Sequence, residues 1–402
     1  MSALLTVEQA DEHIRAATAN FGVEEIPVSD TAGRILRQPV RAERDLPPFD
    51  RVMMDGIALR HAAWADGQRA FRTEGIAAAG SPAMSLVSED GCIEVMTGAV
   101  MPDGTDCVIP VERIDQSDGV AEVHSDYSPE PGQFIHRQGS DHPADTVLLE
   151  PGMRLGGPEA AVAAAAGLSV LKVGRMPSIG VISVGDELVE PGDPILPHQV
   201  RRSNDYAIEV AIRARRAGSV KRLFIEDDRE QMLERIGACL EDADALVLSG
   251  GVSMGKFDFV PAVLDTLGIE RVFHKVSQRP GRPMWFGRSA AGQPVFALPG
   301  NPVSAAVCLS RYVLPSLERG MGLRRVAPRC LRLGQTVRFE PDLTFFLPVT
   351  IQPADDAALV GAPQKPNTSG DFASLAGTDG FIELPRGRDV FPQGFVARFW
   401  PW

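Results

Sequence analysis

The sequence predicts a multidomain α/β plus β protein that contains a doubly wound α/β domain, and three observations carry this prediction. Residues 178–319 alternate apolar strand-like runs with helical patterns, which is typical of a parallel sheet covered on both faces. Residues 45–140 hold short strand-like pieces between Gly, Pro and Asp turns, which indicates an inserted β-rich domain. Short alternating strands from residue 327 onward favour a C-terminal β-barrel, and the N-terminal portion is helical.

The expected elements outside the α/β region are mostly short. A helix is expected over 6–20, where Thr6 begins a cap and apolar residues follow at helical spacing. Short segments follow at 25–28 and 35–40, and a second helix at 158–168 has Pro158 near its first turn. The expected strands are 56–60, 93–96, 107–110 and 120–124 in the insert, and 332–339 and 390–399 in the barrel.

The α/β region has a regular order of strands and helices. Its expected helices are 204–217, with Ser203 or Asn204 as cap, then 229–240, capped by Asp228, and finally 259–267 and 303–319. Its expected strands are 178–184, 220–225, 245–248 and 295–298. Because such strands run parallel, we expect ligands at their carboxyl ends.

Composition and charge narrow the function classes. The chain has 402 residues, 44% hydrophobic and 23% charged, so it can bury a sizeable core in about two to four domains. A net charge of −13 disfavours nucleic-acid binding. The most apolar stretch, 160–173, is too short for a membrane span, and the first residues lack a signal-peptide pattern, so we expect a cytoplasmic protein.

Cysteine and histidine sites have little support. The five cysteines are far apart without a C-x-x-C pair, which argues against both a disulfide framework and a zinc site. The seven histidines contain no H-x-x-x-H pair, so a histidine metal site or a Ser-His-Asp triad is not indicated.

Two loops of the α/β region are candidate anion sites, because each follows an apolar strand and precedes a helix. In SGGVSMGKFD (249–258) the glycines let backbone amides approach a ligand, although a plain βα loop reads the same way and the P-loop spacing is missing. In LPGNPVS (298–304) a well-capped helix is the alternative. The candidate residues are Ser249, Gly250, Gly251, Ser253, Gly255, Pro299, Gly300, Asn301, Pro302 and Ser304.

Positive charge is concentrated in the segment KVSQRPGRP (275–283). Lys275, Arg279 and Arg282 stand on a bent stretch that turns at Pro280 and Gly281. Fixed cations with arginine forks suit phosphate recognition, and a solvated basic loop is the alternative.

Carboxylates stand at several loop ends, where they could hold Mg²⁺ beside a phosphate. Three of them follow α/β strands or close the Gly-rich loop and are the candidate metal ligands: Glu187, Asp228 and Asp258. Each of the three also suits a helix cap or a turn. Further candidates for the reaction are Asp55, Thr97 and Asp141, of which Thr97 could bond a ligand or form a turn.

Taken together, these segments resemble the molybdopterin molybdenumtransferases, the MoeA and gephyrin E-domain family. The matching segments follow the family order across nearly the whole chain. They are PPFDRVMMDGIALR (47–60), VMTGAVMPDGTDCVIPVE (95–112), RQGSD (137–141), SVGDELVEPG (183–192), SNDY (203–206), LSGGVSMGKFDFV (248–260), KVSQRPGRP (275–283), LPGNPVSA (298–305) and SLAGTDGFIELP (374–385).

The resemblance implies four domains in an elongated subunit. They are a helical domain from 1–45 and 141–176, a β-rich domain from 46–140, a molybdopterin-binding α/β domain from 177–326 and a β-barrel from 327–402. It also implies a homodimer whose cleft lies between the third domain of one subunit and the second domain of the other.

The implied reaction is metal insertion into a pterin. Molybdopterin-AMP and molybdate are the implied substrates, Mg²⁺ assists cleavage of the pyrophosphate linkage, AMP leaves, and the dithiolene sulfurs capture molybdenum. The molybdopterin adenylyltransferase is an implied partner. The implied catalytic residues are Asp55, Thr97, Asp141, Glu187, Asp228 and Asp258.

The sequence departs from the family pattern at three places. It reads DRVMMDG at 50–56 where many members read DNSAMDG, it has Arg279 and Arg282 where lysines are common, and FLPV at 346–349 lacks a frequent arginine. The choice between molybdate and tungstate therefore stays open. A paralogue handling tungstate, a non-catalytic scaffold and a molybdopterin adenylyltransferase are the alternatives.

Overall fold

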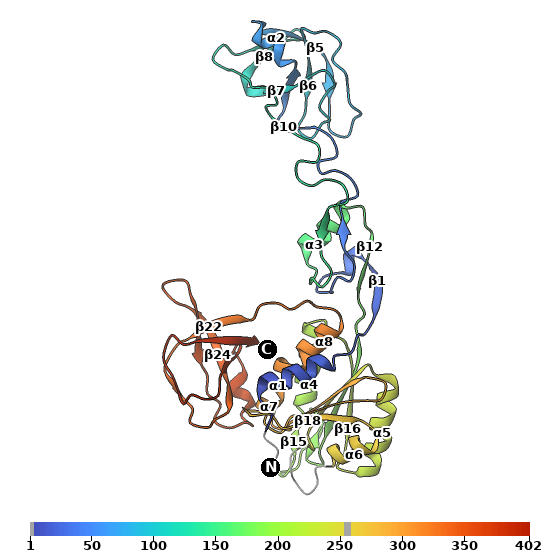
Figure 1. The fold of residues 1–402 in the computed structure, drawn as a ribbon, viewed down its shortest axis with the longest axis vertical. Helices are drawn as coiled ribbons and strands as arrows, with labels where there is room; N and C mark the ends of the chain where they lie inside the picture. The colour runs from blue at the N-terminus through green and yellow to red at the C-terminus, as the bar shows by residue number, and fades with distance from the viewer. Residues whose placement is uncertain (1–3, 253–258) are drawn as a thin grey trace. The chain divides into compact units, whose positions relative to one another are not determined.

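The computed structural model describes residues 4–252 and 259–402, which form two compact units (Figure 1). The larger unit comprises Met1–Gln38, Pro151–Ala160 and Val170–Trp402, and the smaller unit comprises Pro39–Glu150 and Ala161–Ser169. None of the helices in the described part of the chain has the length and hydropathy that a membrane crossing requires.

A six-stranded mixed sheet is the centre of the larger unit, in the order β16-β13-β17-β21-β20-β18. The strands predicted from sequence run parallel: β13 (Ser178–Val184), β16 (Ser219–Ile225), β17 (Ala245–Ser249) and β21 (Pro294–Leu298). Two strands were not predicted, β18 (Glu270–His274) and β20 (Trp285–Arg288), and β20 is antiparallel to both of its neighbours. The predicted strands form a parallel sheet as expected, but the unpredicted β20 makes the complete sheet mixed, because the segment between β18 and β20 is too short for a parallel crossover.

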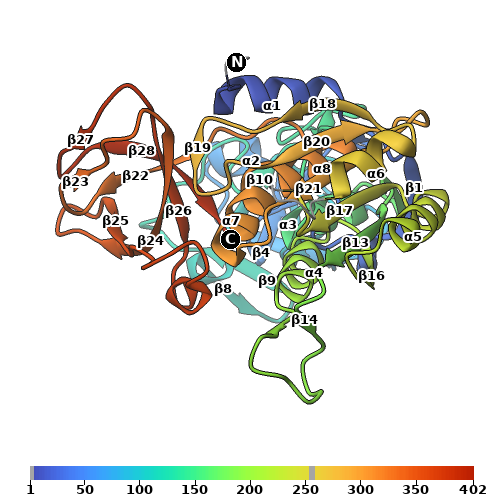
Figure 2. The same ribbon diagram turned by 90° about the horizontal axis from the view of Figure 1, so that it is seen from below.

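Helices cover both faces of this sheet (Figure 2), as the predicted double winding requires. Alternate strand residues point to opposite faces, so Val247 and Phe296 join the core under α1, α4 and α7, whereas Leu246 and Val295 join the core under α5 and α6. The helices are α1 (Val7–Ala16), α4 (Asn204–Ala214), α5 (Arg229–Asp242), α6 (Val260–Thr266) and α7 (Pro302–Cys308). Thr6 caps α1 with a full capping box, as predicted, but the helix ends earlier than residue 20.

The predicted helix 303–319 is interrupted. After α7 the chain makes a five-residue π-helical turn, Leu309–Val313, and continues as α8 (Leu314–Gly320). Pro315 explains the break, because it has no N–H to donate to the carbonyl one turn earlier.

The C-terminal strands close into a barrel. Five strands follow the order β24-β25-β22-β28-β26, and β26 pairs back to β24. They are β22 (Arg329–Leu333), β24 (Thr344–Pro353), β25 (Leu359–Pro363), β26 (Gly380–Leu384) and β28 (Val396–Pro401). The predicted strands 332–339 and 390–399 are each split, because turns at 334–336 and 392–395 separate β23 (Val337–Arg338) and β27 (Val390–Phe391) from the barrel strands.

Short strand pairs complete the larger unit. β1 (Val23–Pro27) is antiparallel to β12 (Val170–Gly174), and β14 (Leu188–Val189) pairs with β15 (Val200–Arg201). β19 (Gln278–Arg279) runs parallel to β24 and so joins the basic segment to the barrel. The predicted segment 35–40 makes only isolated bridges in this unit.

The smaller unit is built on a second six-stranded sheet, in the order β7-β4-β6-β5-β9-β8. Its strands are β4 (Gly56–Leu59), β5 (Ala70–Ala77), β6 (Gly91–Val95), β7 (Cys107–Pro110), β8 (Ile114–Ser117) and β9 (Val120–Val123), of which β5 and β8 were not predicted. Further elements are β2 (Val40–Arg41), which pairs with β11 (Val147–Leu149), β3 (Arg51–Val52), which pairs with β10 (Ile135–His136), and α2 (His61–Ala65). Helix α3 (Gly157–Ala165) crosses the division between the units.

Candidate functional site

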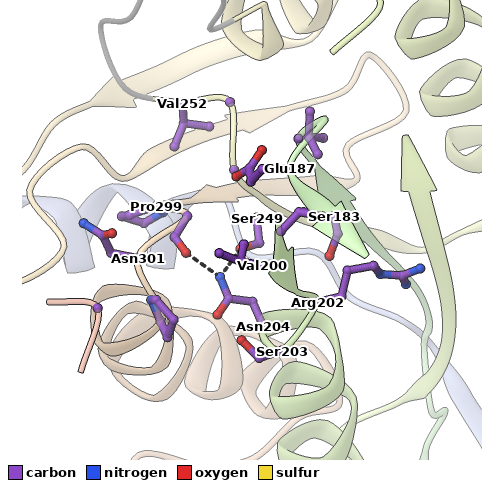
Figure 3. Close-up of a pocket in the computed structure, with 18 of the residues that line it drawn as sticks. Ser183, Glu187, Val200, Arg202, Ser203, Asn204, Ser249, Val252, Pro299 and Asn301 are labelled. Atoms are coloured by element: carbon purple, nitrogen blue, oxygen red, sulfur yellow. Dashed lines mark hydrogen bonds between the residues drawn. The ribbon is translucent and has the colours of Figure 1, made fainter. Parts of the chain in front are cut away.

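A pocket of about 740 Å³ lies where β13, β17 and β21 end, which we call the carboxyl-edge pocket (Figure 3). Both predicted anion loops contribute to it, together with the loop after β13 and the start of α4. Its lining includes Ser183, Gly185, Glu187, Asn204, Asp227, Ser249, Gly250, Gly251, Val252, Pro299, Gly300, Asn301 and Pro302. The predicted Ser253, Gly255 and Asp258 lie outside the described residues.

The first glycines of the 249–258 loop are dictated by close packing. Gly250 has φ +99°, and a Cβ there would lie 2.3 Å from the Val184 carbonyl oxygen. Gly251 has φ +66°, and its Cβ would lie 2.7 Å from a methyl carbon of Val260. A side chain would push the loop away from β13 at Gly250 and away from α6 at Gly251, so these glycines keep backbone at the pocket wall.

Asn204 connects the two loops, a role that sequence reasoning missed. Its Nδ2 donates to Ser249 Oγ and to the Gly300 carbonyl oxygen, both at 2.8 Å (Figure 3). Of the two predicted caps, Ser203 holds the N-cap position of α4 but makes no side-chain capping bond, and Asn204 is the first residue of the helix. The motif SNDY at 203–206 could have indicated this role, but it was interpreted only as a helix cap and as one of the family segments.

Two arginines line this pocket, Arg201 and Arg202, and both already have partners. Arg201 donates its Nη1 to the Glu190 carbonyl oxygen at 2.7 Å. Arg202 lies between carboxylates, with its Nη1 2.6 Å from Glu190 Oε2 and its Nη2 bonded to the fully buried Asp205. An anion in the carboxyl-edge pocket would therefore depend on backbone amides more than on either guanidinium.

The predicted metal ligands are placed differently from one another. Glu187 lines the carboxyl-edge pocket, and so does Asp227. Asp228 instead caps α5, where its Oδ1 accepts from the Gln231 amide at 2.8 Å. Within the described residues there is no cluster of three or more metal-ligating side chains.

A second pocket of about 900 Å³ adjoins the first, because both are lined by Pro283 and Asn301; we call it the basic pocket. It lies between the segment 278–283, the start of α7 and the barrel. Its described lining contains no carboxylate but four cations: Arg279, Arg282, Arg338 and Lys365. Predicted Ser304 lines it, whereas predicted Lys275 lines neither pocket.

The basic pocket also has an apolar wall and a polar bridge. Phe339 and Phe345 stack with ring centroids 4.2 Å apart on its barrel side. Asn301, predicted as the cap of α7, holds that position but donates its Nδ2 to Ser369 Oγ at 2.9 Å. The pocket can therefore accommodate a flat apolar ring beside a bound anion.

The remaining candidates lie in the smaller unit. Thr97 donates its amide and its hydroxyl to Asp55 Oδ1, both at 2.6 Å, and these hydrogen bonds lower the pKa of Asp55. Asp141 Oδ1 lies 3.0 Å from His136 Nε2, and His136 Nδ1 lies 3.0 Å from Arg51 Nη2. The structure thus brings Asp55 and Thr97 together and ties Asp141 to the divergent Arg51.

Comparisons with known proteins cover nearly the whole chain. Residues 5–167 match the MoeA N-terminal region (domain I and II), 180–319 a probable molybdopterin binding domain, and 331–402 the MoeA C-terminal region (domain IV). The molybdopterin molybdenumtransferase of Synechocystis sp. is 39% identical over 99% of this chain and 100% of its own, and that of Synechococcus elongatus 34% over 97% and 98%. The molybdopterin biosynthesis MoeA protein from Pyrococcus horikoshii superposes with a TM-score of 0.83 at 28% identity over 99% of both chains.

Proposed function

Because this chain belongs to the family of molybdopterin molybdenumtransferases, enzymes of molybdenum cofactor biosynthesis, we propose that it cleaves adenylylated molybdopterin, inserts molybdenum from molybdate and releases AMP. One structural observation gives this reaction its main support. Two adjoining pockets of different chemistry share Pro283 and Asn301 at the carboxyl edge of the sheet. A reaction that joins a nucleotide-linked pterin to a metal oxyanion needs two such anion sites side by side.

We assign the carboxyl-edge pocket to the adenylyl end of the substrate. Gly250 and Gly251 line it, and the Gly250 amide donates to the Leu298 carbonyl oxygen at 3.2 Å. Asn204 fixes their loop against the second loop, so the phosphate would meet a preset backbone. Glu187 is the described carboxylate that we propose for Mg²⁺, with Asp258 as a second ligand. Mg²⁺ commonly takes one or two carboxylates and completes its shell with phosphate and water, so this donor set fits it. When bound, it would neutralise the pyrophosphate charge.

Asp228 is a weaker candidate for the metal. One of its carboxylate oxygens accepts the α5 amide, and it is absent from the described pocket lining, where Asp227 stands instead. We therefore propose that Asp228 acts mainly as a helix cap.

We assign the basic pocket to molybdate and the pterin. Molybdate is a dianion, and the described lining of the basic pocket contains Arg279 and Arg282 but no carboxylate that would repel it. The barrel strand at 346–349 lacks the arginine common in the family, and Arg338 and Lys365 place positive charge on the barrel side of the pocket. The stacked Phe339 and Phe345 would pack against the pterin ring.

We further propose a cytoplasmic homodimer with four domains per subunit, in which Asp55, Thr97 and Asp141 complete the cleft of the partner subunit. All five cysteines are free thiols, which fits a reducing compartment. Transfer of the product of an adenylyltransferase would then involve a contact between the two enzymes.

The test is direct. Purified protein is incubated with molybdopterin-AMP, molybdate and Mg²⁺, and AMP release and the activity of a reconstituted molybdoenzyme are measured. We expect both to require molybdate and Mg²⁺. A parallel incubation with tungstate measures the choice of metal, and one with unadenylylated molybdopterin and ATP tests for adenylyl transfer. AMP release that ignores molybdate, or pyrophosphate release from ATP, would contradict the proposal.

A further inference from the structure

A buried glutamine lies beneath the two cations of the basic segment. Gln278 is fully buried, and its Nε2 lies 3.3 Å from the Pro280 carbonyl oxygen and 3.1 Å from the Gly281 carbonyl oxygen. These carbonyls belong to the turn between Arg279 and Arg282. One side chain thus holds the backbone that connects both arginines of the basic pocket.

Tyr312 determines which way that carboxamide points. Its phenol is buried in the π-helical turn and hydrogen-bonds to Gln278 Oε1. Burial holds the pKa of Tyr312 well above its usual value, so the hydroxyl keeps its proton and donates it. The reverse orientation would turn the amide oxygen toward two carbonyl oxygens, so Nε2 must face the turn.

The turn at Pro280 and Gly281 is packed closely against the residues below it. Gly281 has φ +89°, and a Cβ there would lie 2.6 Å from Cys308 Sγ and 2.8 Å from Gln278 Nε2. Cys308 adds a weak contact, with its Sγ 3.7 Å from the Gly281 carbonyl oxygen. On the other side, β19 pairs Arg279 with Phe345 of the barrel. The turn is therefore held from below by α7 and its π-helical turn, and laterally by β24.

The π-helical turn that carries Tyr312 is itself bonded to the barrel. Arg311, the residue before Tyr312, is buried, and its Nε donates to Glu383 Oε2 of β26 at 3.0 Å. Trp400 Nε1 donates to the same carboxylate oxygen at 2.8 Å. These contacts hold the π-helical turn in place, and with it the Tyr312 hydroxyl that orients Gln278.

We propose that Tyr312 and Gln278 are positioning residues that set the geometry of Arg279 and Arg282 for the oxyanion in the basic pocket. The inference rests on the proposed function of that pocket. Neither side chain is charged, so neither attracts the anion itself. The hydroxyl and the carboxamide act through the backbone of the turn that carries the two arginines. Loss of the hydroxyl leaves Gln278 free to rotate and loosens both arginines together.

The test compares Tyr312→Phe and Gln278→Met with wild type. Steady-state AMP release gives kcat and the KM for molybdate, and thermal unfolding gives the Tm of each variant. For Tyr312→Phe we expect the KM for molybdate to rise about tenfold, the loss of one well-placed hydrogen bond, with a smaller change in the KM for molybdopterin-AMP. Tyr127→Phe, a half-buried phenol of the smaller unit, is the matched control and should leave both KM values unchanged.

A double-variant cycle separates positioning from stability. If both residues act through one chain of contacts, Tyr312→Phe should add little to the KM of Gln278→Met. Additive effects, or a fall in Tm with an unchanged KM for molybdate, would overturn the inference. If wild-type AMP release does not depend on molybdate, the proposed function fails first; if it does and Tyr312→Phe keeps a normal KM, only the positioning role fails.

Discussion

Thr97 and Asp55 form a contact whose strength can be measured at one carboxyl group. The Thr97 hydroxyl is the largest cause of the lowered pKa of Asp55, and its amide adds to the effect. We expect Thr97→Val to raise the pKa of Asp55 toward its ordinary value of about 3.9, since one of the two donors is lost. A carbon-detected NMR titration of the carboxyl group gives this pKa.

The sign of the stability effect follows from the same shift. A carboxyl group with a lowered pKa in the folded protein stabilises it above the unfolded-state pKa, and this contribution is lost as the pH falls through the folded-state value. The Tm difference between wild type and Thr97→Val should therefore be present at neutral pH and vanish in strong acid. An unchanged pKa of Asp55 in the variant would refute the assignment.

His136 stands between a group that can only donate and one that accepts. Because the Arg51 guanidinium has no acceptor, Nδ1 of the neutral ring accepts from it, and the ring proton is on Nε2, facing Asp141. We expect the ring nitrogen shifts of neutral His136 to report the Nε2–H tautomer, and Arg51→Ala to produce a mixture of tautomers. Equal tautomer populations in wild type would show that Arg51 does not orient this ring.

Single residues differ in how well the sequence predicts them. The tight turn at Gly250 and Gly251 was predicted, because glycines between an apolar strand and a helix indicate a backbone conformation that other residues rarely adopt. Asn204 was missed, because its hydrogen bonds go to Ser249 and Gly300, residues distant in sequence. The hydrogen bond between Gln278 and Tyr312 was missed for the same reason, since the two residues are 34 positions apart in sequence and meet only in the folded chain.

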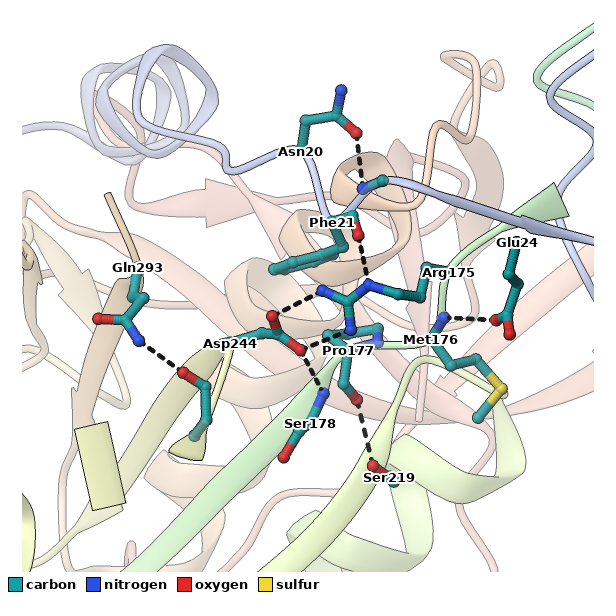
Figure 4. A network of polar contacts seen from close by, with 12 residues as sticks. Asn20, Phe21, Glu24, Arg175, Met176, Pro177, Ser178, Ser219, Asp244 and Gln293 are labelled. Atoms are coloured by element: carbon teal, nitrogen blue, oxygen red, sulfur yellow. Dashed lines mark hydrogen bonds and ion pairs between the residues drawn. The ribbon is translucent and has the colours of Figure 1, made fainter. Parts of the chain in front are cut away.

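At the scale of elements, an ion pair connects the segment before β13 to the residue before β17 (Figure 4). Arg175 donates from Nη1 and Nη2 to the two oxygens of Asp244, at 2.9 and 2.7 Å, and from Nε to the Phe21 carbonyl oxygen at 2.6 Å. Asp244 also accepts from the Ser178 amide at 2.8 Å. Arg175 is the largest cause of the lowered pKa of Asp244.

We expect Asp244→Asn to lower the free energy of unfolding by about 1–2 kcal/mol at neutral pH, a modest value because the pair is partly open to solvent. Since the pKa of Asp244 is lowered, its contribution is present above about pH 4 and lost as the pH falls through the folded-state pKa. Urea unfolding of both proteins across this pH range checks the prediction. A constant difference down to strong acid would mean that the charge of Asp244 is not what stabilises the junction.

Element boundaries show where local patterns stop being informative. Helix α5 and its Asp228 cap were predicted closely, because cap and apolar spacing agree within one segment. The pair of β18 and β20 was missed, because neither strand alternates between buried and exposed residues. Glu270 and Arg271 of β18 are both exposed, whereas the first three residues of β20 are all buried. The π-helical turn was missed because its cause, Pro315, was read as part of a continuous helix.

At the scale of the molecule, the sequence predicted which kinds of domain occur and left their assembly open. The α/β sheet and the closed barrel follow from patterns within each segment, and the family match extends across both. The pairing of β19 with β24, which joins them, involves two residues on each strand and leaves no such pattern. The four domain boundaries and the dimer remain predictions.

Complementation between subunits tests the dimer and its site together. Asp55 and Thr97 belong to the smaller unit, whereas Glu187 and both pockets belong to the larger unit. If the smaller unit completes the cleft of the partner, a heterodimer of Asp55→Asn and Glu187→Gln subunits has one cleft without any substitution. With free exchange at equal amounts, half of the dimers are mixed, so about a quarter of wild-type activity should return.

The reciprocal mixture makes the result decisive. When wild type is mixed with an equal amount of the double variant Asp55→Asn/Glu187→Gln, every cleft of a mixed dimer carries one substitution if clefts form between subunits. Only the remaining wild-type dimers then work, and about a quarter of the activity of an all-wild-type sample is expected. If each cleft lies within one chain, every wild-type subunit keeps its own, so this mixture would retain about half of the activity and the first mixture would recover none.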